Sequence, residues 1–136
     1  MTRPILLLAA LGGLVLLTAA QQPSALATTS AGDWELNGVQ GNKGAVRQCV
    51  TDLMMLTQFE HRSQHCTSKV ISDRGNSTVV QYSCGPAGFG RTQIDVLTPR
   101  SLRISTQGIS DGLPFNYVMQ ARRMGDCTKS ASSSRH

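Results

Sequence analysis

The sequence predicts an all-β domain with mainly antiparallel strands, arranged as a curved sheet or an open barrel or sandwich, with one short helix and two disulfides. Three observations predict this class. From Ser68 onward the hydrophobic pattern has a period of two, turns containing Gly or Pro interrupt it, and the chain has 4 cysteines. With 136 residues it forms one domain at most, and a hydrophobic content of 40% excludes a wholly disordered chain.

The N-terminus has the three parts of a secretory signal peptide. A short basic start, Met1–Pro4, precedes the apolar run Ile5–Ala19. Small residues at positions −3 and −1 favour cleavage after Ala27, which makes residues 1–27 the signal peptide; a cut after Ala20 is the lesser alternative. A membrane-spanning helix needs roughly 20 apolar residues, so the run is too short for an anchor. We therefore expect a periplasmic or secreted protein without a permanent membrane anchor.

All four cysteines follow the expected cleavage site. An even number of cysteines in an exported chain indicates disulfides formed in an oxidising compartment. A structural zinc site is the alternative, but the chain lacks the C-x-x-C spacing typical of such sites. The four residues are Cys49, Cys66, Cys84 and Cys127.

The segment between Cys66 and Cys84 helps to decide their pairing. Two β-branched runs flank a turn signal that contains Gly and Asn, which predicts a hairpin. A turn centred on Gly75 brings Cys66 opposite Cys84, and Cys49 then pairs with Cys127 by elimination. The other opposite pairs that follow are Val70 with Val80 and Ile71 with Val79.

One helix and several strands are expected along the chain. The helix, Leu53–His61, follows a good N-cap residue. Around Trp34 we expect a first strand pair with a type I′ turn at Asn37-Gly38, and Ala45–Val50 alternates as a further strand. The later strands are expected near residues 67–72, 78–84, 91–97, 101–107 and 115–123.

The hairpin around Pro99 has a predicted register. If Thr98–Arg100 is an odd-length loop, hydrophobic side chains meet on one face and a charge pair forms on the other. An even loop would mix the two faces. The predicted opposite pairs are Ile94 with Ile104, Val96 with Leu102, and Asp95 with Arg103.

Several landmarks follow one another in a fixed order. They are Trp34-Glu35, Cys49-Val50-Thr51, the Cys66–Cys84 hairpin and the ending Ala121–Cys127. In this order they resemble the bacterial exported family known as domain of unknown function 3617, over roughly residues 32 to 127. The resemblance implies export, disulfides and an all-β architecture, and it implies no activity. We expect a single disulfide-stapled domain over residues 28–127 and a disordered Ser-rich tail over 128–136.

Basic side chains are the candidate binding residues. On adjacent strands they could form a basic face for phosphate groups, anionic lipid or polyanionic envelope material. The alternative is an ordinary charged outer face, in which Asp95 neutralises Arg103. Nucleic acid is not an expected partner, because export removes the usual targets and aromatic residues for stacking are few. The set is Arg91, Arg100, Arg103, Arg122 and Arg123.

His61 and His65 are weak candidates for a metal site. They are four positions apart, so one helical face could carry both imidazoles, and Met and His side chains suit copper. However, the helix is expected to end before Cys66, and the local spacing fixes no third ligand. A solvated helix end with core methionines is the favoured interpretation, and we expect no cofactor.

No catalytic pattern stands out. The single G-x-S-x-G match, Gly108–Gly112, lies between two expected strands and not at the strand-to-helix turn that the nucleophile motif needs. Pairing all cysteines in disulfides removes the thiol nucleophiles, so we do not expect an enzyme. The leading prediction is an exported domain that binds a ligand or envelope partner. The alternative is a structural or protective envelope protein without a small ligand, and copper or zinc handling is a lesser alternative. An apolar cavity of several hundred Å³ would favour binding, and a filled interior the structural alternative.

Overall fold

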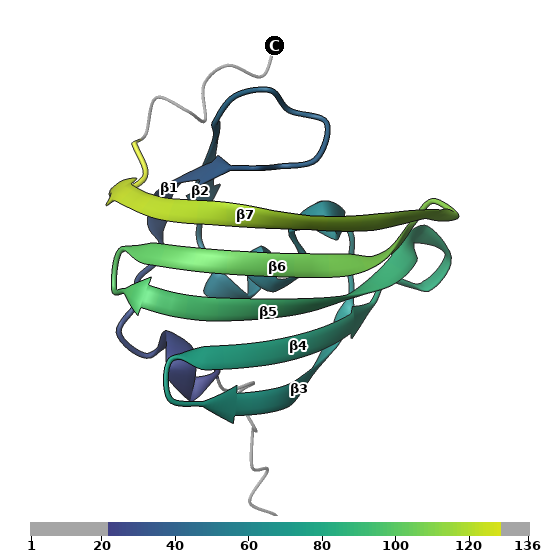
Figure 1. Cartoon of the computed structure of the whole chain (residues 1–136), viewed down its shortest axis with the longest axis horizontal. Coiled ribbons are helices and arrows are strands. Elements are labelled where there is room, and N and C mark those ends of the chain that lie inside the picture. Colours follow the sequence, from purple (N-terminus) through teal and green to yellow (C-terminus); the bar gives the residue numbers. More distant parts are fainter. Residues whose placement is uncertain (1–21, 129–136) are drawn as a thin grey trace, which may run out of the picture.

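The computed structural model describes residues 22–128 and contains an open, seven-stranded antiparallel sheet (Figure 1). The strand order is β2-β1-β7-β6-β5-β4-β3, so β2 and β3 are the edges. This confirms the predicted all-β class. Most of the expected signal peptide and of the tail lies outside the described residues. The strands are β1 (Gly32–Asn37), β2 (Val46–Val50), β3 (Thr67–Arg74), β4 (Ser77–Ser83), β5 (Gly88–Thr98), β6 (Ser101–Ser110) and β7 (Leu113–Gly125).

Three short 3-10 helices accompany the sheet: η1 (Ser24–Leu26), η2 (Leu53–His61) and η3 (Gly85–Ala87). The second occupies the segment predicted as the helix. The Asp52 carboxylate caps it by accepting a hydrogen bond from the Met54 backbone N–H at 2.9 Å. It lies behind β5 and β6 (Figure 1). We call the side of the sheet against η2 the covered face and the other side the open face.

The hydrophobic core lies between η2 and the covered face. Strand alternation sends every second side chain of β5 and β6 into it, among them Ile94 and Ile104, which are both fully buried. From η2, Leu56 and Phe59 pack against them. The remaining members are Leu26, Trp34, Leu36, Val39, Val50, Leu53, Val96, Leu102, Met119 and Ala121. These side chains fill the interior of the half-open sheet.

The β5–β6 hairpin has the predicted pairs: Ile94 lies opposite Ile104, Val96 opposite Leu102, and Asp95 opposite Arg103. The turn that produces them differs from the expected odd loop. Thr98 pairs with Ser101, so the turn has two residues, and the register shifts at Leu97. This one-residue bulge restores the alternation that an even turn would have broken.

The β3–β4 hairpin repeats this arrangement. Val70 lies opposite Val80 as predicted, but the expected pairing of Ile71 with Val79 is wrong, because Ser72 occupies that place. The turn is centred between Gly75 and Asn76, half a residue beyond the expected centre at Gly75, since Arg74 pairs with Ser77. Ile71 forms a bulge that corrects the offset.

The expected tight turn at Asn37-Gly38 is also wrong. Strand β1 pairs with β2, and Leu36 lies opposite Val46, so a long loop joins the two strands. Gly38 has a φ of 94° and lies directly against the backbone of Val118. The next residue, Val39, enters the core. Burial of Val39 thus draws the chain away from a two-residue turn.

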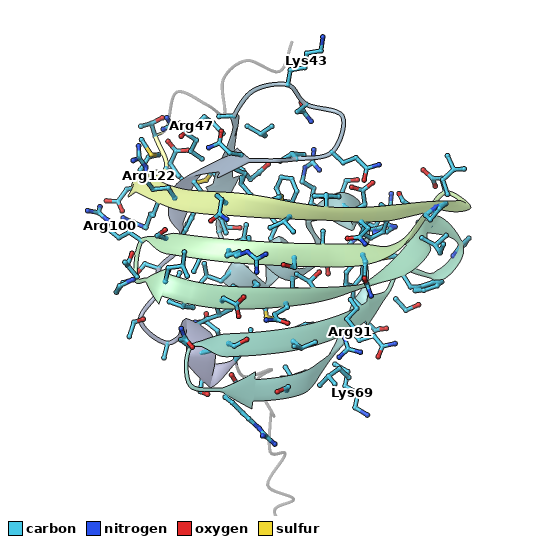
Figure 2. The ribbon with its side chains drawn as sticks, viewed as in Figure 1. Lys43, Arg47, Lys69, Arg91, Arg100 and Arg122 are labelled. Carbon is cyan, nitrogen blue, oxygen red and sulfur yellow. A yellow bond between two sulfur atoms is a disulfide. The ribbon has the colours of Figure 1, made fainter. Side chains whose placement is uncertain are left out.

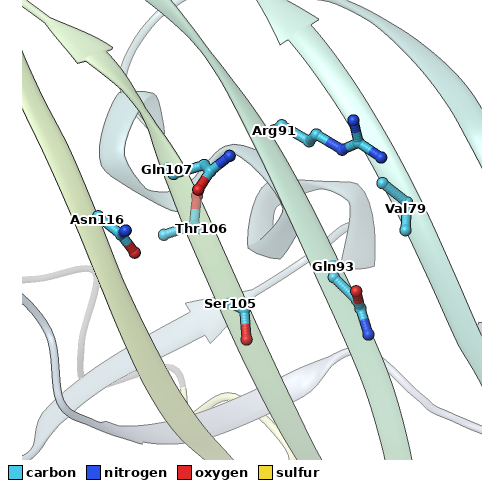
Figure 3. Close-up of a pocket in the computed structure, with 7 residues that line it drawn as sticks. All are labelled: Val79, Arg91, Gln93, Ser105, Thr106, Gln107 and Asn116. Carbon is cyan, nitrogen blue, oxygen red and sulfur yellow. The ribbon is translucent and has the colours of Figure 1, made fainter.

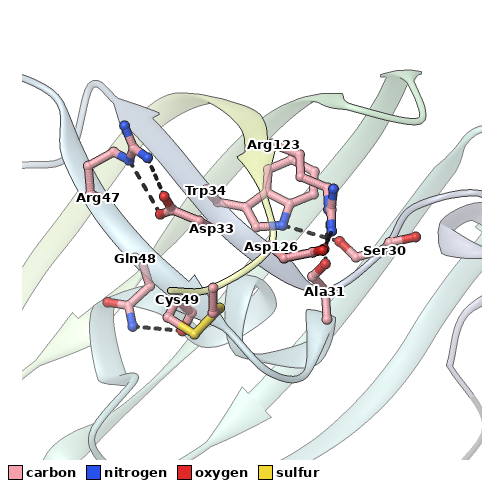
Figure 4. Close-up of a disulfide and its surroundings, with 10 residues drawn as sticks. Ser30, Ala31, Asp33, Trp34, Arg47, Gln48, Cys49, Arg123 and Asp126 are labelled. Atoms are coloured by element: carbon pink, nitrogen blue, oxygen red, sulfur yellow. Dashed lines mark hydrogen bonds and ion pairs between the residues drawn. A yellow bond between two sulfur atoms is a disulfide. The ribbon is translucent and has the colours of Figure 1, made fainter. Parts of the chain in front are cut away.

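Two disulfides join Cys49 to Cys127 and Cys66 to Cys84, the same pairs as those expected from the sequence. The first connects β2 to the segment that follows β7, beside the ion pair of Arg47 with Asp33 (Figure 4). The second closes the β3–β4 hairpin, with its two Cα atoms 4.2 Å apart. Such bridges form in an oxidising compartment.

None of the helices within residues 22–128 has the length and hydropathy needed to cross a membrane.

Candidate functional site

A row of polar side chains crosses five strands on the open face. Consecutive members lie directly opposite one another in the sheet register, so their side chains point to the same side. All five are exposed. The members, from β3 to β7, are Lys69, Gln81, Arg91, Gln107 and Asn116. We call this set the polar row.

The polar row is positively charged. It has two cations, Lys69 and Arg91, three amides, and no carboxylate. Among the described residues neither cation forms an ion pair. Adjacent strands lie about 4.8 Å apart, so the backbones of these two residues are about 10 Å apart, with Gln81 between them. Figure 2 shows both side chains at the same end of the sheet.

A second row, which we call the apolar row, lies next to the polar row. Its members are Phe89, Ile109 and Pro114, which are mutual partners across β5, β6 and β7. The Phe89 ring is 52% exposed. An exposed apolar surface beside a polar one marks a potential contact surface.

Shallow hollows follow these two rows. One of about 170 Å³ lies between the polar row and the next open-face positions along β5 and β6, Gln93 and Ser105 (Figure 3). A second, of about 450 Å³, lies between the polar and apolar rows, and a third, of about 550 Å³, reaches Lys69 and edge strand β3. The first two share Arg91, Gln107 and Asn116. The polar row therefore runs along a nearly continuous groove.

Directly beneath the rows, on the covered face, two adjacent glycines lie between two aromatic residues. Tyr82, Gly90, Gly108 and Phe115 are successive partners across β4 to β7. A Cβ on Gly90 would lie 2.5 Å from the Tyr82 hydroxyl, and one on Gly108 would lie 2.9 Å from the Phe115 ring. The glycines therefore make the space in which the two rings lie flat under the sheet.

His61 joins these rings to η3 through two hydrogen bonds. Its Nε2 lies 3.1 Å from the Ala87 carbonyl oxygen, which can only accept, so Nε2 carries the hydrogen. Its Nδ1 then accepts from the Tyr82 hydroxyl at 3.0 Å. Burial raises the pKa of Tyr82 to about 12, the Glu60 charge adds to this, and a hydrogen bond from Thr106 opposes it. The Tyr82 hydroxyl and both ring nitrogens of His61 therefore have protein partners beneath the groove.

Tyr117 also anchors the C-terminal end of η2 to the sheet, through Glu60, the residue next to His61. Its hydroxyl donates to the Glu60 carboxylate at 2.8 Å. Burial raises the pKa of Tyr117 strongly, and the hydrogen bond and charge of Glu60 raise it further. Neither tyrosine is positioned to act as an acid or base on the open face.

The arginines expected to form a basic face are distributed over the molecule. Arg91 lies in the polar row, but Arg100 and Arg122 lie at the opposite end of the sheet (Figure 2). Arg103 lies 4.0 Å from Asp95, the charge pair that the sequence predicted. Arg123 points to the covered side and donates to the Ala31 carbonyl oxygen and to Asp126 (Figure 4). The structure therefore separates Arg91 from the other four.

The two histidines do not form a shared site. Strand-facing His61 ends η2 and is 3% exposed, whereas His65 lies in the exposed loop that follows. The expected solvated helix end is therefore wrong for His61, which is buried. Both of its ring nitrogens have protein partners. No group of three or more His, Cys, Asp or Glu residues within 22–128 is placed to hold a metal ion.

Sequence reasoning missed most of the polar row. It found Arg91 because it searched for charge, and it passed over the neutral members and Lys69. A usable signal was present, because Gln, Ser and Asn recur at outward positions of the predicted strands. Finding the row also required the register of all five strands. The two predicted hairpins gave the register within each strand pair, but not between β4 and β5 or between β6 and β7.

Comparison with known proteins gives one family and no functional relative. A family model described as protein of unknown function (DUF3617) matches residues 28–127. No curated protein and no solved structure matches the chain.

Proposed function

The chain belongs to this family of proteins of unknown function, and we propose that it is an exported, non-enzymatic domain that binds an anionic, hydroxyl-rich ligand across the open face of its sheet. The ligand's carboxylate or phosphate groups lie against Arg91 and Lys69. Its hydroxyl groups exchange hydrogen bonds with the amides of Gln81, Gln107 and Asn116. Its less polar side contacts the apolar row at Phe89.

The polar row is the observation that carries this proposal. Cations without carboxylate neighbours leave an uncompensated positive potential, which attracts anions. Amide side chains both donate and accept hydrogen bonds, so they suit a ligand rich in hydroxyl groups. The buried layer of His61 and Tyr82 keeps the backbone beneath the row in place, and a rigid surface loses little entropy on binding.

Export to the periplasm or the medium is part of the proposal. The two disulfides need an oxidising compartment. The apolar run Ile5–Ala19 behind a basic start has the composition of a signal peptide. Polyanionic glycans and phosphate-bearing polymers are ligand classes available in that compartment.

The structural alternative has one specific observation in its favour. The interior is filled by side chains such as Trp34, Leu56 and Phe59, so the sheet does not enclose an apolar ligand as a lipid carrier would. A filled interior was the expectation for a structural or protective envelope protein. Binding on the open face, rather than inside the sheet, is what distinguishes our proposal from this alternative.

Ligand retention decides between them. Protein purified from the exported fraction of its own host is examined by native mass spectrometry, and a thermal-shift panel uses oligogalacturonate, glycerol phosphate and inorganic phosphate. Binding predicts a retained anion or a rise in Tm that increases with ligand concentration and decreases with salt. If no molecule is retained and no ligand raises Tm, the binding proposal fails and the structural alternative remains.

Charge-matched variants locate the site. Arg91→Gln and Lys69→Gln together remove the positive charge of the polar row, so we expect them to abolish the shift. Arg100→Gln and Arg122→Gln remove the same charge at the other end of the sheet and serve as controls. Equal loss in both double variants would mean non-specific attraction to a basic protein. All four residues are exposed, so Tm without ligand should change little.

A further inference from the structure

Helix η1 belongs to the folded domain although it precedes residue 28. The side chain of Leu26 is fully buried and is part of the hydrophobic core, and Ala25 is 5% exposed. The Gln22 side chain donates to the Leu26 carbonyl oxygen at 2.8 Å. This short segment therefore contributes to the core like an element of the domain.

Asp73, at the end of edge strand β3, holds η1 in place. Its carboxylate accepts three hydrogen bonds: from the Ser24 N–H at 2.7 Å, the Ser24 hydroxyl at 2.8 Å and the Ala25 N–H at 3.0 Å. The backbone N–H groups at the start of a helix otherwise lack partners. One carboxylate from a distant strand thus caps η1, which makes the contact specific.

Cleavage after Ala27 would remove all of these contacts. It would excise Leu26 from the core and leave a hole beneath the edge of the sheet, and it would leave Asp73 without its three donors. Removing one buried leucine side chain already costs a small domain a large share of its stability. Cleavage upstream of Gln22 retains every contact.

We propose that the signal peptidase cuts after Ala20 and that the mature protein begins at Gln21. Ala20 and Thr18 supply the small residues at −1 and −3, and the cut follows directly after the apolar run Ile5–Ala19. Hydrolysis of the Ala20–Gln21 peptide bond consumes one water and leaves a carboxylate on Ala20 and a free amine on Gln21. The inference rests on the export proposed above.

The N-terminus of the processed protein tests this directly. The full chain is expressed with its own leader, recovered from the exported fraction, and analysed by intact mass and N-terminal peptide sequencing. We expect Gln21, or its cyclised form that has lost ammonia, as the first residue. A chain that begins at Thr28 would overturn the inference while leaving export intact. A chain that retains residues 1–20 would overturn both.

A second measurement tests the physical reason. Chains that begin at Gln21 and at Thr28 are each released from a cleavable fusion, and the shorter one should have a Tm lower by about 10 °C or more. Asp73→Ala should lower Tm in the longer chain and leave the shorter chain unchanged. Arg74→Ala, the neighbouring exposed position, should act equally in both. An Asp73→Ala effect of the same size in both chains would contradict the capping role.

Discussion

At the scale of single residues, the site depends on two glycines in the strands that carry it. Gly90 and Gly108 have no side chain, and this absence lets Tyr82 and Phe115 lie flat under the strands that carry the polar row. The ring of His61 packs against both, at centroid distances of 5.5 Å and 5.9 Å. The exposed residues of the polar row are thus positioned by largely buried aromatic residues beneath them.

Gly90→Ala tests this dependence. Its new Cβ would lie 2.5 Å from the Tyr82 hydroxyl, so the ring must shift and its bond to His61 must lengthen. Overpacking of this kind costs about 1–3 kcal/mol in the free energy of unfolding, measured by denaturant titration. Gly44→Ala is the control, because a Cβ there meets nothing within 4 Å. Equal free energies for both variants would contradict the proposed packing.

At the scale of elements, the two predicted hairpins have correct pairs produced by unpredicted turns. In each, a two-residue turn is combined with a one-residue bulge, and the bulged residues Ile71 and Leu97 are exposed hydrophobics. Alternation of side chains reports which residues share a face, so it predicted the pairs. It does not report how the chain reaches that register, because a bulge and an odd loop give the same result.

Helix η1 adds a pH dependence at this scale. Hydrogen bonds from the backbone of Ala25, and then from Ser24, hold the pKa of Asp73 below its ordinary value. A lowered folded-state pKa stabilises the protein above the unfolded pKa of about 3.9, and this contribution is lost as the pH falls through the folded value. The Tm difference between wild type and Asp73→Ala should therefore be constant near neutral pH and shrink below about pH 4.

Arg74→Ala provides the comparison for this titration, because an arginine keeps its charge throughout the range. Its Tm difference from wild type should show no step below pH 4. If the Asp73→Ala difference persisted unchanged at pH 2, the carboxylate charge would not be what holds η1.

At the scale of the whole molecule, the sequence predicted the class, the pairs of cysteines and the family, but only one member of the polar row. The reason is physical. A disulfide or a hairpin is specified by a short stretch of chain, whereas the polar row exists only when β3 to β7 are all in register. Arg91 and Asn116, for example, are distant in sequence and come together only because both pair with Gln107 on β6.

The two disulfides act on different parts of this molecule. Cys49–Cys127 spans 78 residues and ties edge strand β2 to the end of β7, whereas Cys66–Cys84 spans 18 and closes the hairpin that carries Lys69. Loop entropy assigns them about 4.5 and about 3.2 kcal/mol respectively. We expect Cys49→Ala/Cys127→Ala to lower the free energy of unfolding by about 1.3 kcal/mol more than Cys66→Ala/Cys84→Ala does.

Ligand binding should rank the two bridges in the opposite order. Opening Cys66–Cys84 loosens edge strand β3 and with it Lys69, so the thermal shift caused by an anionic ligand should decrease. Opening Cys49–Cys127 affects β2 and the C-terminal end of β7, whereas Asn116 of the polar row lies near the start of β7. The long-bridge variant should bind as the wild type does at temperatures where it remains folded. Reduced binding in the long-bridge variant alone would place the ligand near β2 and contradict the polar row as its site.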